Sequence, residues 1–243
     1  MALNTFHLFA GAGGGILADL LLGHIPVGAC EIEKYPRDVL LARQRDGILP
    51  AFPIWDDVCT LDGKPWRGSV DVLCGGFPCQ DISSAGKGAG ITGERSGLWK
   101  EYARLIGEMR PQFVFAENSP LLRTRGLGVV LEDLAALGYN ARWGIIGARD
   151  VGAPHKRDRM WVLAYAPSGR LQGGESRSEI QPADCDLSSM VRRGELDFGI
   201  PKPHGLRKTN GVANFMDRVK AIGNGQVPAV AATAWNILSD GLV

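Results

Sequence analysis

The chain has 243 residues, of which 45% are hydrophobic and 22% charged, and its formal net charge is +1. These values are typical of a globular protein with one large domain or two small ones. The longest apolar run near the start, residues 16–22, is short and interrupted by Asp19. We therefore expect neither a signal peptide nor a membrane-spanning helix, no membrane partner, and a cytoplasmic protein.

The chain has five cysteines at scattered positions: Cys30, Cys59, Cys74, Cys79 and Cys185. The number is odd, and neither a CxxC pair nor a Cys/His cluster at zinc spacing occurs, so we expect no disulfide framework and no metal site. Cys79 stands apart because it follows an apolar run on a Gly/Pro loop, where its thiol would be presented as a nucleophile. The other four are expected to be small buried side chains.

The first elements in chain order have the pattern of a Rossmann-like unit. Residues 3–9 predict a strand, followed by a glycine turn at 10–15, a helix at 16–22 and a second strand that ends in Glu31. An acid about 20 residues beyond the first glycine binds ribose hydroxyls in such folds. Ile16 stands where the third glycine of GxGxxG would be, which favours a cofactor without pyrophosphate, such as S-adenosylmethionine.

Strands and helices continue to alternate along the chain. The pattern predicts a helix after Lys34, a strand near Ile54, an acidic loop at 55–58, a strand at 70–74, an amphipathic helix at 97–109, a buried strand at 113–116, a helix at 127–137 and a strand at 160–165. Such alternation predicts an α/β fold, a mixed and mostly parallel sheet with helices on both faces and ligands at the carboxyl ends of its strands.

The composition changes after Tyr165. Residues 166–211 are rich in Gly, Ser, Pro and Arg, and helical patterning returns after them. We predict a catalytic and cofactor-binding core at 1–165, a small irregular recognition insertion at 166–211, and a C-terminal segment at 212–243 that returns to the core. Residues 192–220 carry seven Lys or Arg against three acids, which is compatible with a polyanion on one face.

Three loops are predicted to meet at one end of the sheet: the glycine turn with Glu31 and Asp57, the loop that carries Cys79, and the strand end at Glu117. A thiol next to a carboxyl group and a cofactor pocket suggests covalent catalysis on an electrophilic carbon.

Five motifs occur in the order found in C5-cytosine DNA methyltransferases. They are FAGAGG at 9–14, GFPCQ at 76–80, EN at 117–118, GAPHKRDR at 152–159 and GNGQVP at 223–228. The chain resembles this family over about residues 3–165 and 214–240. The resemblance implies a Rossmann-like adenosylmethionine-dependent methyltransferase fold, and the activity of a site-specific DNA (cytosine-5-)methyltransferase.

The resemblance also implies how the reaction proceeds. Cys79 would add to C6 of a cytosine flipped out of the duplex, while Glu117 hydrogen-bonds and protonates N3. The C5 atom could then take the methyl group of S-adenosylmethionine, which leaves as S-adenosylhomocysteine. Arg159, and by resemblance Arg157, would hold the cytosine O2 and the Cys79 loop, and a nearby arginine would lower the pKa of the thiol.

For the cofactor, the resemblance places Phe9 on the adenine, Glu31 at the ribose hydroxyls and Asp57 near the adenine amine. Leu98 and Asn224 would complete the pocket around the methionine end. The full set of expected cofactor residues is Phe9, Gly11, Gly13, Gly14, Glu31, Ile32, Asp57, Val58, Pro78, Leu98 and Asn224.

The chain departs from the family pattern at three positions, with His155 in place of Gln, Gly225 in place of Val, and Ser119 in place of Val. The insertion at 166–211 is also short for a target recognition domain. The expected partner is double-stranded DNA, optionally with an associated restriction endonuclease, and the expected state is a monomer.

Three alternatives remain open. An RNA cytosine-5 methyltransferase would share the fold and the motifs. A catalytically silent binding module would keep the fold alone, although Cys79, Glu117 and Arg159 are all present. A folate-dependent pyrimidine nucleotide methylase would also use thiol addition to C6, but the glycine turn with its ribose acid argues against it.

Overall fold

The computed structural model describes residues 2–78, 97–167, 184–185 and 225–243. Its strands are β1 (Asn4–Leu8), β2 (Ile25–Cys30), β3 (Ile54–Trp55), β4 (Val72–Gly76), β5 (Phe113–Asn118), β6 (Asn140–Ile146), β7 (Arg159–Tyr165) and β8 (Asp184–Cys185). Its helices are α1 (Gly14–Leu22), α2 (Lys34–Arg45), α3 (Leu98–Met109), α4 (Leu122–Arg125), α5 (Leu127–Ala136) and α8 (Pro228–Leu238), with short 3₁₀ turns η1 (Lys64–Trp66) and η3 (Ala148–Val151).

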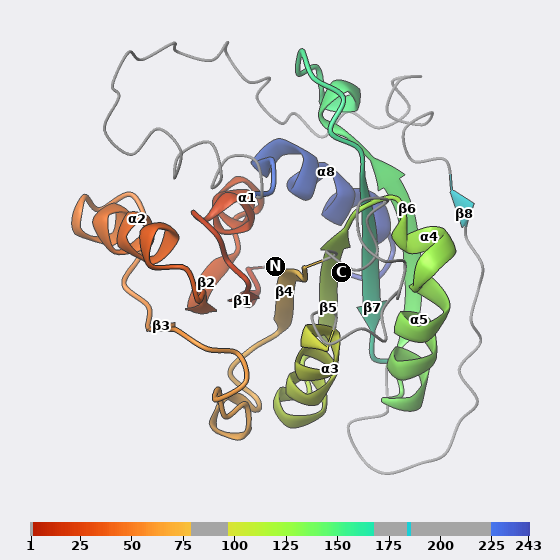
Figure 1. The fold of residues 1–243 in the computed structure, drawn as a ribbon, viewed down its shortest axis with the longest axis horizontal. Helices are drawn as coiled ribbons and strands as arrows, with labels where there is room; N and C mark the ends of the chain where they lie inside the picture. Colours follow the sequence, from red (N-terminus) through yellow and green to blue (C-terminus); the bar gives the residue numbers. More distant parts are fainter. Residues whose placement is uncertain (1, 79–96, 168–183, 186–224) are drawn as a thin grey trace.

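The described strands form one sheet in the order β3-β2-β1-β4-β5-β7-β6-β8 (Figure 1). Strands β1 to β5 are parallel, and β7 runs antiparallel to both β5 and β6. The reversal brings the start of β7 to the same edge of the sheet as the carboxyl end of β5, since Asn118 pairs with Met160. Side chains from both ends can therefore meet at this edge.

Residues that alternate along the central strands pack against helices on opposite faces. Val72 and Cys74 of β4, with Phe113 and Phe115 of β5, share a core cluster with α8, whereas Leu73 packs with α3 and α5. Period-two alternation of this kind is what a strand covered on both faces requires. Figure 1 shows α1 beside α8 and α3 beside α5, one pair on each side of the sheet.

The start of α1 lies very close to the segment that enters α8. A β-carbon built on Gly14 would lie 2.1 Å from the backbone oxygen of Gln226, a distance that no side-chain rotation could relieve. Glycine is therefore required at this position by space. The close approach connects the glycine turn to residues more than two hundred positions later in the chain.

The predicted fold class is confirmed: the sheet is mixed and mostly parallel, and helices cover both faces. Strand β6 was not predicted. Glu117 and Asn118, expected just after a strand, are the last two residues of β5. Most of the predicted insertion at 166–211 lies outside the described residues. Within the described part, we find no helix with the length and apolarity needed to cross a membrane.

We predict that Gly14→Ala lowers the free energy of unfolding by about 1–3 kcal/mol, because the new methyl group overpacks against backbone. Gly128→Ala is the matched control: it lies in α5 with open space around the position, and should raise the free energy of unfolding by up to about 1 kcal/mol. Urea denaturation would measure both, and an equal effect of the two substitutions would contradict the packing argument.

Candidate functional site

The glycine turn after β1 is fixed by the carboxylate of Glu31, at the end of β2. The backbone N–H of Gly11 donates to Oε2 of Glu31 at 2.7 Å, and that of Glu33 donates to Oε1 at 2.8 Å. Gly11 and Gly13 have φ angles of 54° and 91°, which favour glycine. Glu31 is only 7% exposed. Each of its oxygens has a second lone pair that a ligand hydroxyl could use.

Two large apolar side chains near Glu31 are exposed. Ile32 is 66% exposed, and Trp55 of β3 is also exposed. Exposed large apolar side chains beside a carboxylate at strand ends fit an adenosine group, whose sugar hydroxyls need an acceptor and whose base needs an apolar contact. Asp57 follows β3 at the same edge, where its Oδ1 accepts from the N–H of Cys59 at 2.9 Å. The residues present therefore fit the expected cofactor.

Phe9 and Leu98 lie on the side of the turn that faces α3. Phe9 adopts a positive φ of 52°, uncommon for a residue with a side chain, and its ring lies 6.3 Å from that of Tyr102 between centroids. Leu98 is the first residue of α3 and packs against the core. The strained backbone at Phe9 is held in place by these neighbours, as is common at ligand sites.

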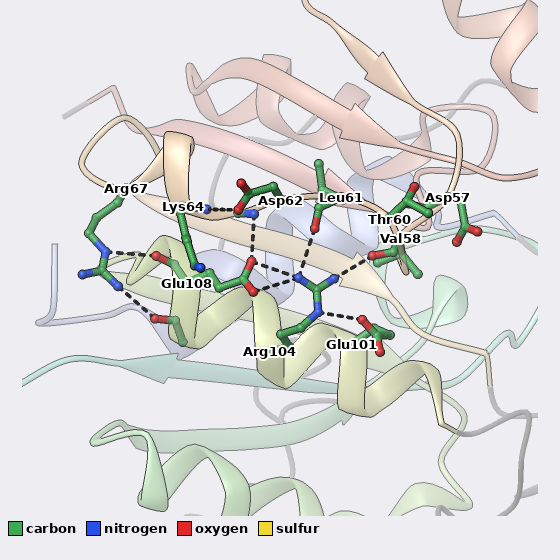
Figure 2. Close-up of polar contacts among 12 residues, drawn as sticks. Asp57, Val58, Thr60, Leu61, Asp62, Lys64, Arg67, Glu101, Arg104 and Glu108 are labelled. Atoms are coloured by element: carbon green, nitrogen blue, oxygen red, sulfur yellow. Dashed lines mark hydrogen bonds and ion pairs between the residues drawn. The ribbon is translucent and has the colours of Figure 1, made fainter.

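Arg104 of α3 holds the loop that carries Asp57 and Val58 (Figure 2). Its guanidinium donates to the carbonyl of Val58 at 2.9 Å and to that of Leu61 at 3.0 Å. Glu101 and Glu108, one turn away on either side, hold the guanidinium at 2.7 and 2.9 Å. These hydrogen bonds attach the loop to α3.

The same helix holds the next part of the loop. Oε2 of Glu108 accepts from the N–H of Gly63 at 2.8 Å, and Arg67 donates to the carbonyls of Gly107 and Glu108 at 3.2 and 3.0 Å (Figure 2). Residues 58–67 thus have several side-chain bonds to α3 and few regular backbone bonds of their own.

The segment leading to Cys79 begins at the end of β4. Asn118 donates from Nδ2 to the carbonyl of Phe77 at 3.1 Å, and Phe77 is buried against Trp99. Pro78 is the last described residue before the gap, so Cys79 itself lies outside the described residues. The structure therefore places only the residues that lead up to this predicted nucleophile.

Glu117, one residue earlier in β5, is 8% exposed and pairs with Arg159 of β7, whose Nε lies 2.8 Å from Oε1. Burial raises the pKa of the Glu117 carboxyl above its ordinary value, while Arg159, Gln226 and Arg157 oppose the shift. A buried carboxyl group with a raised pKa can donate a proton or a strong hydrogen bond near neutral pH.

Arg157 approaches the same carboxylate but also donates to the carbonyl of Gly225, in the segment that enters α8. Its φ of 39° is another left-handed conformation at this edge. Gln226 hydrogen-bonds Glu117 through its side chain. Asn224, the adjacent predicted cofactor residue, lies outside the described residues.

The structure describes the side chains of three cysteines, Cys30, Cys59 and Cys74. Cys30 and Cys74 are buried as predicted, and burial raises the pKa of Cys30 to about 12 and that of Cys74 well above its ordinary value. The prediction for Cys59 is wrong: its side chain is exposed, because it lies on the loop after β3, and its pKa is raised by partial desolvation and by Asp57. None of these three thiols has the lowered pKa of a nucleophile.

The structure brings the described predicted residues to one edge of the sheet. The carboxyl ends of β1 and β2 carry the glycine turn with Glu31 and Ile32, the loop after β3 carries Asp57 and Val58, and the ends of β4, β5 and the start of β7 carry Pro78, Glu117 and the two arginines. Sequence reasoning missed Gln226 and Arg104. The signals were available, since Gln226 lies inside the GNGQVP motif and Arg104 stands at helical spacing from two acids.

The family model for C-5 cytosine-specific DNA methylases matches residues 3–224. The Type II methyltransferase M2.BsuMI of Bacillus subtilis is 34% identical over 94% of this chain and 59% of its own length. M.Eco47II of Escherichia coli is 30% identical over 89% and 52%, and M.HhaI of Haemophilus parahaemolyticus is 32% identical over 78% and 56%. The chain thus spans about half the length of these curated relatives.

Two solved structures share the fold across the whole chain. The Dnmt2 methyltransferase of S. pombe has a TM-score of 0.66 at 15% identity and is covered to 99%, as is this chain. The Entamoeba histolytica methyltransferase EhMeth has a TM-score of 0.65 at 14% identity, with 100% of this chain and 99% of the other covered.

We predict that Arg104→Met loosens the loop at 57–63 while α3 stays folded. The loss of two carbonyl bonds should lower the free energy of unfolding by about 1–2 kcal/mol and speed amide hydrogen exchange in the loop. Lys100→Met, at an exposed position on the same helix, is the control. Unchanged exchange at 57–63 in Arg104→Met would contradict the role given to the guanidinium.

Proposed function

The chain belongs to the C-5 cytosine-specific DNA methylase family, and from that premise we propose that it is a DNA (cytosine-5-)methyltransferase. The observation that supports the proposal most directly is the placement of Glu117. This carboxyl group is buried, has a raised pKa and pairs with Arg159 beside the strand end that leads into Cys79. A hydrogen-bond donor for a ring nitrogen and a thiol for the adjacent carbon are what activation of cytosine needs.

Cytosine C5 is too weak a nucleophile to accept a methyl group directly. In the proposed mechanism the thiolate of Cys79 adds to C6, and Glu117 donates its proton to N3, so that electron density moves to C5. After C5 has been methylated, a base removes the C5 proton, the C5–C6 double bond forms again and Cys79 leaves as the thiolate. The N3 proton returns to Glu117, which is then ready for the next turnover. Between turnovers, Arg159 stabilises the ionised form of Glu117 and holds the carboxylate of Glu117 in position.

S-adenosylmethionine, when bound, supplies an electrophilic methyl group on sulfur and leaves as S-adenosylhomocysteine. The residues proposed to hold it belong to the glycine turn, to the segment after β2 that carries Glu31, and to the loop after β3 that carries Asp57. Glu31 would accept from the ribose hydroxyls, Ile32 and Phe9 would contact the adenine, and Asp57 with Val58 would border its edge. Pro78, Leu98 and Asn224 would enclose the methionine end.

Duplex DNA is the proposed substrate, and the target cytosine would have to leave the stack to reach Glu117. We propose that residues 1–165 and 212–243 form the catalytic core and that 166–211, with the basic residues that follow, select the site. The enzyme would act as a monomer in the cytoplasm. A restriction endonuclease is a candidate partner, because the curated relatives are named Type II methyltransferases.

We expect the wild-type chain to transfer tritiated methyl groups from S-adenosylmethionine to unmethylated duplex DNA. Cys79→Ser should reduce transfer to background and leave cofactor binding, measured by calorimetry, within about threefold of wild type. Glu117→Gln should slow transfer by about 100-fold or more, as is typical when a general acid is lost. Cys30→Ala removes a buried thiol outside the reaction and should remain active.

Near-normal turnover of Cys79→Ser would contradict the covalent mechanism. A parallel reaction with tRNA separates the two nucleic acids: faster transfer to tRNA would move the proposal to an RNA methyltransferase. Cofactor binding without transfer to either substrate would favour a binding module.

A further inference from the structure

A buried polar pair lies behind the glycine turn, and the proposed mechanism does not use it. Nε2 of His7, on β1, lies 2.5 Å from Oδ2 of Asp19, on α1, and the same oxygen accepts from the hydroxyl of Thr5 at 2.6 Å. All three side chains are buried. A buried charged group is costly unless it is fully hydrogen-bonded, so such a pair needs a reason to be there.

A metal ion does not account for the pair. The possible ligand atoms of His7, Asp19 and Cys74 all lie within 4.8 Å of one another. However, His7 and Asp19 are in direct hydrogen-bond contact at 2.5 Å, and two ligands of one zinc ion, each about 2.0–2.1 Å from it at tetrahedral angles, would stand farther apart. His7 therefore donates its Nε2 proton to Asp19, which leaves Nδ1 to face the turn.

Gln226 lies close to this pair, next to Gly15. A β-carbon built on Gly15 would be 2.6 Å from Oε1 of Gln226 and 3.1 Å from Nδ1 of His7. His7, Asp19 and Gln226 also line one small cavity of about 10 Å³. That volume is about the minimum for one water, which could donate to both Nδ1 and Oε1.

The opposite end of the same amide reaches the catalytic carboxyl group. A β-carbon built on Gly76 would be 2.5 Å from Oε2 of Glu117 and 3.4 Å from Nε2 of Gln226, and the Gln226 side chain hydrogen-bonds Glu117. With Oε1 toward His7 and Nε2 toward Glu117, the amide donates to the carboxylate. The reverse orientation would place two acceptor oxygens against each other.

We propose that Gln226 is a positioning residue for Glu117, and that the His7–Asp19 pair fixes its amide with the NH₂ group toward the carboxylate. The inference rests on the proposed function, in which Glu117 acts on the cytosine ring. It connects the cofactor turn to the catalytic carboxyl group, because the Gln226 side chain passes against Gly15 on its way to Glu117. A displaced turn would therefore also displace the donor that orients Glu117.

The Gln226 bond also affects the protonation of Glu117. Among the described residues, the charged and polar groups that face this carboxyl are Arg159 of β7, Arg157 before it, and Gln226 before α8. Of these only Gln226 is neutral, so its removal takes away a hydrogen bond to the ionised form without changing the charge of the site.

The test uses the full chain with the substitutions Gln226→Met, which keeps the length of the side chain, and Gln226→Glu. We expect Gln226→Met to slow methyl transfer about tenfold at saturating duplex DNA and S-adenosylmethionine, and to change cofactor affinity less than about threefold. The pH dependence of the rate should move to higher pH by about half a unit or more, because the ionised form of Glu117 has lost a donor. Gln226→Glu should also move the pH dependence of the rate to higher pH. Asp19→Asn should move it in the same direction by a smaller amount.

Trp235→Phe is the control, since Trp235 lines the same cavity from α8 without reaching Glu117. It should lower the melting temperature and leave the pH dependence unchanged. A ¹³C NMR titration of Glu117, assigned by loss of its signal in Glu117→Gln, gives a readout that does not require turnover. An unchanged Glu117 titration in Gln226→Met overturns the inference, whatever the activity. Absence of transfer by the wild type, with the titration shifted, instead overturns the proposed function alone.

Discussion

The ion pair between Glu117 and Arg159 depends on β7, the one strand among those that the structure describes that runs against the others. Glu117 stands opposite Trp161, so Arg159, two residues away on the same face of β7, is its diagonal neighbour. A parallel strand at this place would carry its start to the far edge of the sheet. The reversal lets an arginine hold a buried carboxylate that would otherwise be too costly to desolvate.

The glycine turn depends on a similar long-range contact. Glu31 holds it from β2, and the backbone and side chain of Gln226 press against it from the segment that enters α8. The turn and Glu117 therefore share a neighbour, although 102 residues separate Gly15 from Glu117. The loop with Asp57 is attached independently, through Arg104 on α3. The proposed cofactor side and the proposed substrate side of this edge thus come from separate parts of one chain and are joined by side-chain contacts.

Hydrophobic periodicity and glycine spacing in the sequence were enough to predict the fold class and the first strand–turn–helix–strand unit with Glu31. They also predicted the amphipathic helix at 97–109 and a carboxyl group at the end of β5. They were not enough for strand β6, whose NARWGII sequence places Arg142 and Gly144 within a strand. The hydrophobic periodicity of a strand also does not show its direction in the sheet. The pairing of Glu117 with Arg159 could therefore be found only in the structure. The exposure of Cys59 likewise depends on where a loop passes over the surface. The proposed role of Gln226 could not be predicted from its motif, because the residues near it lie on three other segments.

The central claim is that this edge of the sheet methylates cytosine at C5 in DNA. Bisulfite sequencing of the genome of a bacterial host that lacks its own cytosine-5 methylation, and that expresses this chain, tests it most directly. We expect cytosines protected from conversion in one recurring sequence context, and complete conversion in cells with the empty vector. Complete conversion in cells that contain the folded, adenosylmethionine-binding chain would contradict it.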